Sequence, residues 1–157
     1  MLRIEYMDEA DFASYLEQSI SNYAEEKVKA GTWRDDGALV KSRETYARLL
    51  PEGNHTKDQH IFSLTDTEKN RKVGVLWLGI PGEDADSEGA FLFDLLVYPE
   101  FRRLGYGMQA MKAVEEVARH LGRNRISLHV FGHNRPAIEL YEKSGYLVED
   151  IVMYKEI

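Results

Sequence analysis

The segment from Arg102 to Met108 has the residue types and the spacing of a main-chain binding site for an anion. Gly105 and Gly107 lack a Cβ, so a ligand can approach the backbone closely at both positions. A helix is predicted to follow from Gly107, and the unpaired N–H groups of a helix start point at a ligand with the positive end of the helix dipole behind them. Arg102 and Arg103 add positive charge and bidentate donors suited to phosphate oxygens. The pattern predicts a cradle for a pyrophosphate.

Two other phosphate-binding motifs compete for this segment. Gly105 to Ala110 match the dinucleotide fingerprint GxGxxA. In that fold the first glycine follows the strand at once, and an acidic residue about 20 positions later binds the ribose. Here a longer loop intervenes and Ser127 to Phe131 contains no acid, so we interpret the match as accidental. A Walker P-loop does not fit, because no Lys-Ser/Thr pair follows the last glycine.

Asp94 is the polar residue of a predicted strand, Phe91 to Val97, that is otherwise apolar. A carboxylate in such a strand needs a physical reason, because burying an unpaired charge is costly. Asp94 is therefore the most informative polar residue of the predicted sheet.

The elements that must position these residues follow from hydrophobic periodicity and from turn chemistry. Strands are predicted at Leu2 to Tyr6, at three runs between His60 and Val97, at Ile126 to Phe131, and after Gly145. Helices are predicted from the capping residue Asp8 to Gly31, from Asp36 to Leu50, from Gly107 to Gly122, and from Asn134 to Ser144. This order predicts an α/β domain of the α+β type, with a mixed, mostly antiparallel sheet, helices on both faces and one parallel crossover.

The apolar residues of each element recur at the spacing that a buried face requires. Those of the helices are Phe12, Leu16, Ile20, Ala24 and Val28 in the first, Leu39, Val40, Tyr46, Ala47 and Leu50 in the second, and Met111, Val114, Ala118 and Leu121 in the third. The run from Val73 to Ile80 is apolar on both faces, which predicts a central strand.

The composition of the chain limits the number of domains, the partners and the cellular location that can be expected. The chain has 157 residues, which is the length of one domain covering residues 1–157, and 43% of them are hydrophobic. A net charge of -7 without a Lys/Arg-rich run argues against nucleic acid as a partner. No apolar stretch approaches the roughly 20 residues that span a bilayer, and no targeting segment is indicated, so we expect a cytoplasmic protein without a membrane partner.

Two motifs resemble those of one family. The string VYPEFRRLGYG looks like the coenzyme A signature of the GNAT superfamily of N-acetyltransferases, R/Q-x-x-G-x-G/A, which Arg102, Gly105 and Gly107 fill. The string NRPAIELYEKSGY is similar to a later motif of the same superfamily. The resemblance covers Val73 to the C-terminus well and the two opening helices in outline.

The resemblance implies direct transfer of an acetyl group from acetyl-coenzyme A to a primary amine of a small molecule or peptide, within a ternary complex. The chain has no cysteine, which agrees with this mechanism because no acetyl-enzyme can form through sulfur. The alternative is a non-catalytic regulatory module that binds acetyl-coenzyme A on the same fold. A homodimer is compatible with the sequence.

The resemblance also implies residue roles. The pantetheine arm is expected to pair with the backbone of Leu95, Leu96 and Val97, where a main-chain N–H faces the developing oxyanion. The residues expected to bind the coenzyme further on are Arg102, Arg103, Leu104, Gly105, Tyr106, Gly107, Met108 and Asn134. Asn134 also has the sequence context of a helix N-cap, and both roles are compatible.

Tyr141 is the candidate partner of the leaving thiolate, and the alternative is a core aromatic. Asp94 is the candidate general base, because burial can raise the pKa of a carboxyl toward a useful range. Structural pairing with a cation is its alternative. Some relatives place the acid three residues earlier, where this chain has Phe91, and Glu88 or a water chain could serve as the base instead.

A pair of histidines and a pair of aromatic residues also have residue types found in functional sites. His129 and His133 are four residues apart, but that spacing aligns metal ligands only on a helix, and we expect solvated imidazoles and no metal. Tyr23 and Trp33 lie at or beside the end of the first predicted helix and could line an acceptor pocket, although packing is the commoner role of such aromatics.

Overall fold

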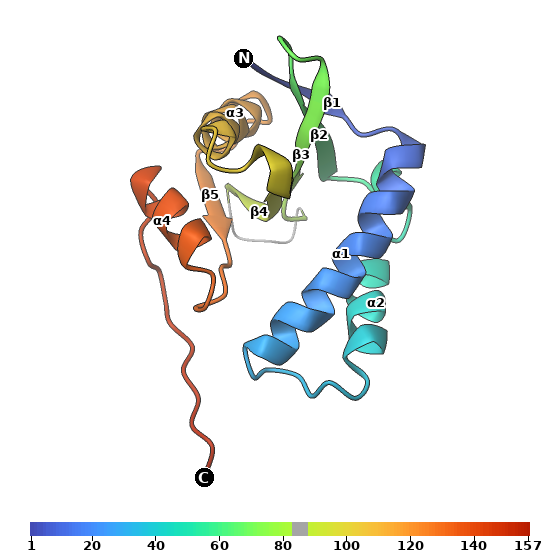
Figure 1. Ribbon diagram of the computed structural model, residues 1–157, viewed down its shortest axis with the longest axis vertical. Helices are drawn as coiled ribbons and strands as arrows, with labels where there is room; N and C mark the ends of the chain where they lie inside the picture. The colour runs from blue at the N-terminus through green and yellow to red at the C-terminus, as the bar shows by residue number, and fades with distance from the viewer. Residues whose placement is uncertain (83–87) are drawn as a thin grey trace.

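The computed structural model describes residues 1–82 and 88–157 (Figure 1). Its elements, in chain order, are β1 (Leu2–Tyr6), α1 (Glu9–Lys29), α2 (Ala38–Leu49), a short 3-10 turn η1 (Gly53–His55), β2 (Gln59–Asp66), β3 (Arg71–Gly79), β4 (Gly89–Val97), a second 3-10 turn η2 (Pro99–Phe101), α3 (Tyr106–His120), β5 (Arg125–Leu128) and α4 (Arg135–Lys143).

These strands form one five-stranded sheet in the order β1-β2-β3-β4-β5. The first four strands are antiparallel neighbours, and β5 lies parallel to β4 from Gly89 opposite Arg125 to Leu92 opposite Leu128. Helix α3 makes the crossover between β4 and β5 (Figure 1). The mixed, mostly antiparallel sheet and the central position of β3 are confirmed.

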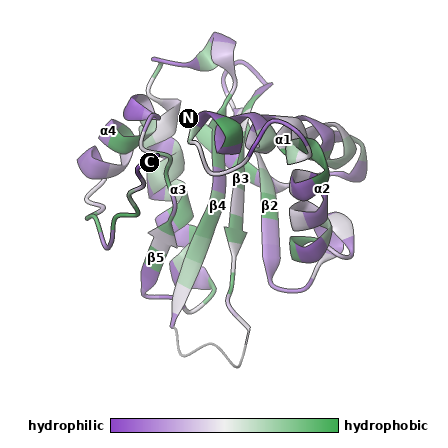
Figure 2. Ribbon diagram, turned by 90° about the horizontal axis from the view of Figure 1, so that it is seen from below, coloured by the Kyte–Doolittle hydropathy of each residue, from purple (hydrophilic) through white to green (hydrophobic). Residues whose placement is uncertain are grey.

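Helices cover both faces of the sheet, and each face has its own hydrophobic core (Figures 1 and 2). Helix α3 packs on one face through Ala110, Met111, Val114 and Ala118. On the other face Phe12 and Tyr15 of α1 pack with Val75 and Trp77 of β3. Val75, Leu76 and Leu78 are fully buried, as a strand covered on both faces requires.

Local signals place the helix ends where the sequence predicts them. The Asp8 carboxylate accepts a hydrogen bond from the Asp11 N–H at 2.8 Å, which caps α1. Gly31 follows the end of α1 with φ of +78°, and Gly122 follows α3 with φ of +72°. Both values lie in the left-handed region that glycine adopts without a Cβ penalty.

The buried face of α2 differs from the prediction. Leu39 and Val40 are exposed, whereas Ala38 and Ser42 are buried. The Ser42 hydroxyl donates to the Ile20 carbonyl at 2.6 Å, and two small residues let α2 approach α1 closely. Close contact between the helices, rather than the larger apolar side chains, sets the orientation of α2.

Two strand predictions are wrong in part or in full. The strand predicted at Ile126 to Phe131 ends at Leu128, because Phe131 instead packs beside Tyr23 of α1 and the pairing with β4 stops there. The segment after Gly145 forms no strand, since no neighbouring strand of the described chain pairs with it. None of the helices in residues 1–82 and 88–157 has the length and apolar character needed to cross a membrane.

Candidate active site and coenzyme site

A β-bulge in β4 determines which way Asp94 faces. Trp77 pairs with Asp94 and the next residue of β3, Leu78, pairs with Leu92, so Phe93 is an extra residue in β4. The Phe93 ring stacks on Trp77 at 4.6 Å between ring centroids, on the face that α1 covers. The bulge changes the alternation of the strand and turns the Asp94 side chain toward α1 as well.

Asp94 is partly buried and receives a hydrogen bond from the Tyr15 hydroxyl of α1 at 2.6 Å. Loss of solvent raises the pKa of Asp94 above its ordinary value, although the hydrogen bonds from Tyr15 and from the Leu95 N–H act in the opposite direction. Asp94 forms no ion pair with any residue that the structure describes. Its neutral form is therefore favoured more than that of an exposed aspartate.

Glu88, the other carboxylate considered as a base, has a different environment. It is exposed and accepts a hydrogen bond from the Asn124 side chain at 2.9 Å.

Tyr141 lies in α4, close enough to Asp94 for the two groups to interact electrostatically. Burial, and secondarily the Asp94 charge, raises the pKa of Tyr141 to about 12. Its ring packs against the core under α3, with the Tyr146 ring 6.0 Å away. Among the described residues its hydroxyl has no hydrogen-bond partner. The Tyr141 ring therefore packs in the hydrophobic core, while its hydroxyl remains available to hydrogen-bond a ligand.

Tyr15 and Tyr46 complete this cluster, and the sequence did not single them out. The pKa of Tyr15 is raised by burial and then by Asp94, and the pKa of Tyr46 is raised by the same causes in the same order. Tyr15 lies three residues after Phe12 on the buried face of α1. A tyrosine on an apolar face is the available signal, but only the fold shows that its hydroxyl meets Asp94.

The edge of β4 that faces β5 is open beyond Leu92. The parallel pairing ends there, and the Tyr98 N–H donates to the Val73 carbonyl of β3 at 2.9 Å. Because main-chain groups of a strand alternate in direction, those of Leu95 and Val97 point away from β3. The Val97 carbonyl accepts from the Arg102 Nε at 3.0 Å, which agrees with this direction.

Leu96 differs from its two neighbours. Its carbonyl points at Gly74 of β3, where an added Cβ would meet it. The main-chain groups of Leu96 are therefore directed into the sheet, and a ligand beside β4 would reach those of Leu95 and Val97.

Next to this open edge, α3 begins with unpaired N–H groups. The main-chain N–H groups of residues 103–108 donate to no acceptor within residues 1–82 and 88–157, and the first bonded one is Gln109, to the Gly105 carbonyl at 3.2 Å. Gly105 has φ of +84° and Arg103 has φ of +63°, so the chain curls around this point. Consecutive N–H groups of this kind form an anion-binding concavity.

The side chains around the cradle divide into two groups. Arg102, Arg103, Leu104 and Met108 are exposed. The Tyr106 side chain is buried and donates a short hydrogen bond to Asp66 at the β2–β3 turn, which, with the N–H groups of Lys69 and Glu68, lowers the pKa of Asp66 to about 2. Tyr106 therefore anchors the helix start to the sheet and leaves only its N–H for a ligand.

Gly107 has a packing role. A Cβ at this position would lie 3.1 Å from Leu140 Cδ2 of α4. The absence of a side chain lets α3 and α4 approach each other, so that the cradle and Tyr141 belong to one packed unit.

Asn134 caps α4. Its Oδ1 accepts from the Ala137 N–H at 3.3 Å, which confirms the N-cap prediction. Its contact with a coenzyme stays a prediction.

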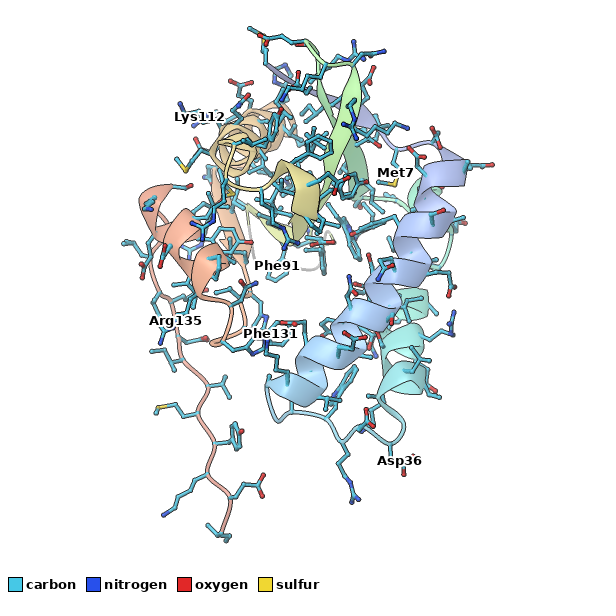
Figure 3. All side chains as sticks on the ribbon, in the orientation of Figure 1. Met7, Asp36, Phe91, Lys112, Phe131 and Arg135 are labelled. Carbon is cyan, nitrogen blue, oxygen red and sulfur yellow. The ribbon has the colours of Figure 1, made fainter. Side chains whose placement is uncertain are left out.

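The segment between β5 and α4 reaches across to the end of α1. Phe131 lies between α4 and α1 (Figure 3), 6.3 Å from the Tyr23 ring, and Tyr23 meets Trp33 edge to face at 5.5 Å. His133 Nε2 lies 2.5 Å from the Glu26 carboxylate. Tyr23 and Trp33 thus belong to an aromatic cluster that closes this end of the molecule.

His129 packs edge to face on Phe131 at 4.9 Å between ring centroids. His133 stacks on the same Phe131 ring, at 5.5 Å between ring centroids. Both histidines are thus engaged with an aromatic ring, and no group of three or more metal-binding side chains occurs within the described residues.

Comparison with known proteins identifies the family. The model of the acetyltransferase (GNAT) family matches residues 18–146. The chain belongs to this family. The resemblance and the fold class inferred from the sequence are confirmed.

Two relatives of this GNAT chain are named N-acetyltransferases. YycN of Bacillus subtilis (strain 168), called an uncharacterized N-acetyltransferase, is 42% identical over 151 residues, which cover 96% of each chain. YdgE of the same organism, also called an uncharacterized N-acetyltransferase, is 32% identical over 154 residues, covering 98% of this chain and 97% of YdgE.

Solved GNAT structures share the fold over the whole chain. The crystal structure of YycN superposes with a TM-score of 0.94 at 39% identity, covering 100% of this chain and 99% of YycN. The PaiA N-acetyltransferase from Thermoplasma acidophilum, solved in complex with coenzyme A, gives a TM-score of 0.69 at 20% identity, covering 97% of this chain and 93% of that one.

Proposed function

We propose that this protein is an N-acetyltransferase that transfers the acetyl group of acetyl-coenzyme A to a primary amine of a small molecule or peptide. The observation that carries the proposal is the run of N–H groups at residues 103–108, unbonded within the described chain, directly beside the open edge of β4. The first feature suits a pyrophosphate and the second suits an extended amide-containing arm.

The residues that would hold the coenzyme extend from β4 to α3. Main-chain groups of Leu95 and Val97 would pair with the pantetheine arm, and the N–H groups from Arg103 to Met108 would bind the pyrophosphate. The Arg103 guanidinium, which is exposed at the rim, adds charge. The shared fold with PaiA, which was crystallised with coenzyme A, supports this placement.

Asp94 is proposed as the general base. A primary ammonium has an ordinary pKa near 10.4 and must lose a proton before nitrogen attacks the thioester. The raised pKa of Asp94 brings this carboxyl closer to the working range of a base. Tyr15 is proposed as a positioning residue, because its hydroxyl donates to one oxygen of the Asp94 carboxylate and so fixes the orientation of that group.

Tyr141 is proposed to donate a hydrogen bond to the departing sulfur. With a pKa of about 12 the phenol stays protonated at neutral pH, whereas a thiol ordinarily titrates near 8.5. A hydrogen bond to the thiolate is therefore favoured over full proton transfer. Direct attack of the amine on the thioester is part of the proposal, and the absence of cysteine agrees with it because no acetyl-enzyme can form through sulfur.

The remaining contribution of the fold is positioning. Two reactants held together in the attacking geometry can remove roughly 7 to 11 kcal/mol from a barrier in the best intramolecular cases. The bulge at Phe93 places Asp94 on the α1 side, and the contact of Gly107 with Leu140 fixes α4 and Tyr141 against the cradle.

Release of free coenzyme A thiol, measured with a thiol-reactive dye, tests the proposal. The acceptor panel contains polyamines, aminoglycosides, amino acids and peptide N-termini. We expect amine-dependent release with at least one class, and saturation in both substrates. Calorimetric binding of acetyl-coenzyme A without release for any amine would support the non-catalytic module instead. Thermal stabilisation by NAD and not by coenzyme A would overturn both the N-acetyltransferase and the non-catalytic acetyl-coenzyme A module.

A further inference from the structure

A set of half-exposed aromatic side chains lies between β4, α1, α2 and the segment before α4. It is here called the aromatic surface and consists of Tyr23, Trp33, Tyr46, Phe91, Phe93 and Phe131. Phe91 meets Phe93 with 4.8 Å between ring centroids, and Tyr46 meets Tyr23 at 6.0 Å. The buried Trp77 ring links the two pairs, at 4.6 Å from Phe93 and 5.9 Å from Tyr46. Ligand sites are lined by such rings together with a few polar groups.

Asp94 lies at one end of the aromatic surface. It follows Phe93 directly in β4. Burial, then the Asp94 charge and then Tyr23 raise the pKa of Tyr46, so Tyr46 is within electrostatic reach of both groups. An amine placed at Asp94 would therefore have the aromatic surface beside the rest of its carbon skeleton.

Two lysines lie at the other end of the aromatic surface. The Lys27 ammonium is 5.3 Å from the centre of the Trp33 ring and 5.6 Å from that of the Tyr23 ring, and the Lys41 ammonium is 5.9 Å from Trp33. Neither lysine forms an ion pair with any residue in the described part of the chain. The Lys27 charge also reaches the segment before α4, because after loss of solvent it helps to lower the pKa of His129.

The acidic side chains at this end of the molecule do not neutralise the two lysines. Glu26 pairs with His133. Asp35 and Asp36 are exposed in the turn before α2 and form no ion pair with another described residue. Figure 3 shows Asp36 well apart from Phe131. The aromatic surface therefore has a carboxylate at one end and uncompensated positive charge at the other.

We propose, resting on the function proposed above, that the acceptor is an anionic aromatic amine, whose amine and acid groups lie at opposite ends of a flat body. The amine would lie at Asp94, the flat body along the aromatic surface, and the acid group at Lys27, which acts as a specificity residue. An α-amino acid has its two charges one carbon apart, which is too short because Tyr46 and Tyr23 separate Asp94 from Lys27. A polyamine or an aminoglycoside would bring a second positive charge to Lys27 and Lys41, which disfavours its binding.

A matched series of primary amines tests the charge preference. It consists of para-(aminomethyl)benzoate, the neutral para-(aminomethyl)benzamide, benzylamine and the dication para-xylylenediamine. Thiol release gives kcat and KM for each amine, and calorimetry in the presence of coenzyme A gives Kd without turnover. We expect KM and Kd to be about tenfold lower for the benzoate than for the benzamide and to be highest for the diamine, with similar kcat values.

Lys27→Met tests the assignment of that preference to Lys27. The change keeps an apolar stem and removes the charge, so the benzoate and the benzamide should bind about equally well, and kcat/KM for the benzamide should stay unchanged. Lys29→Met is the matched control, because Lys29 is exposed in the same last turn of α1 and meets the same helix dipole. It should keep the preference of the natural chain. A lysine that only stabilises the helix end would lower Tm in both variants and leave the preference unchanged.

The outcomes separate this inference from the proposed function. Thiol release without a preference for the benzoate would overturn the anionic acceptor and leave the N-acetyltransferase intact. Binding of the benzoate that is lost in Lys27→Met, with no release from any amine, would support the acceptor class and contradict the N-acetyltransferase. A preference that persists in both Lys27→Met and Lys27→Gln would overturn the role of Lys27. Circular dichroism checks that each variant is folded, and the comparison of amines on the natural chain needs no variant.

Discussion

At the scale of single residues, the chemistry of the site depends on one extra residue in β4. Without the bulge at Phe93, strand alternation would turn Asp94 toward α3, away from the hydroxyl of Tyr15. With the bulge, the carboxylate meets Tyr15 of α1 and interacts with Tyr141 of α4. Three elements that are distant in sequence therefore act on one carboxyl.

The pH dependence of turnover tests Asp94 and Tyr15 together. The Tyr15 hydrogen bond stabilises the carboxylate and lowers the pKa of Asp94, so Tyr15→Phe should raise that pKa further. The acidic limb of the kcat/KM profile, where the base becomes protonated, is then expected to move to higher pH. Asp94→Asn should remove this limb. Tyr6→Phe, on exposed β1, is the control and should leave the pH profile unchanged. An acidic limb that is unshifted in both Tyr15→Phe and Asp94→Asn would exclude Asp94 as the general base.

Tyr141→Phe tests the hydrogen bond to sulfur. We expect turnover to fall about tenfold or more, which corresponds to about 1.4 kcal/mol of transition-state stabilisation, with little change in coenzyme affinity by calorimetry.

Tyr146→Phe is the matched control for Tyr141. Its ring lies 6.0 Å from Tyr141, and its hydroxyl is buried without a partner among the described residues. Loss of that hydroxyl should leave turnover unchanged and be neutral or stabilising. Equal turnover of Tyr141→Phe and the natural chain would remove the assignment.

At the scale of elements, the start of α3 combines the proposed coenzyme-binding surface with an anchor. The backbone of residues 103–108 presents unbonded N–H groups, while the Tyr106 side chain holds the same turn to Asp66 of β2. The lowered pKa of Asp66 indicates that the Tyr106 hydroxyl donates to an ionised carboxylate, which is a charge-assisted hydrogen bond. The helix start is therefore fixed before a ligand arrives, which reduces the ordering that binding requires.

Gly105→Ala tests the cradle. No atom lies within 4 Å of the added Cβ, so the change acts through φ of +84° and through the space that a phosphate needs. We expect a loss of about 1–2 kcal/mol in the free energy of unfolding, and about tenfold weaker binding of coenzyme A, which equals about 1.4 kcal/mol.

Gly132→Ala is the control for this change, because its Cβ is also unobstructed and its φ is outside the left-handed region. Both stability and affinity should stay close to those of the natural chain. Undiminished coenzyme affinity in Gly105→Ala would show that the ligand does not approach the backbone at this glycine.

At the scale of the whole molecule, two cores on a common sheet support the proposed site. Val75 and Trp77 belong to the core under α1, whereas Leu76 and Leu78 belong to the core under α3. β4 follows the same division, and its bulge lies where Asp94 meets Trp77. The site therefore depends on the packing of both helical layers against the sheet.

Leu76→Ala measures that dependence. The side chain is fully buried, so its truncation should lower the free energy of unfolding by about 2–5 kcal/mol, measured by urea denaturation. Leu39→Ala removes a leucine that is 51% exposed on α2 and should change stability by about 0.5 kcal/mol or less. Similar losses for the two variants would contradict the arrangement of α2 described here.

Much of the fold is predictable because its signals are local. The cap at Asp8, the turn after Gly31 and the apolar run of β3 each depend on neighbours within a few residues, and the structure confirms them. The helix starts at Gly105 for α3 and at Asn134 for α4 also depend on such local signals. The sequence by itself determined these elements, their order and the family they indicate.

Only the tertiary structure determined which residues of distant elements contact one another. The bulge at Phe93, the hydroxyl of Tyr15 on Asp94 and the inward turn of Tyr106 join residues up to 79 positions apart, and no periodicity records such a pairing. The segment after Gly145 shows the same limit, because its strand pattern is present but its own chain provides no partner. Strand pairing and side-chain contacts are properties of two surfaces that meet, whereas propensity belongs to one segment alone.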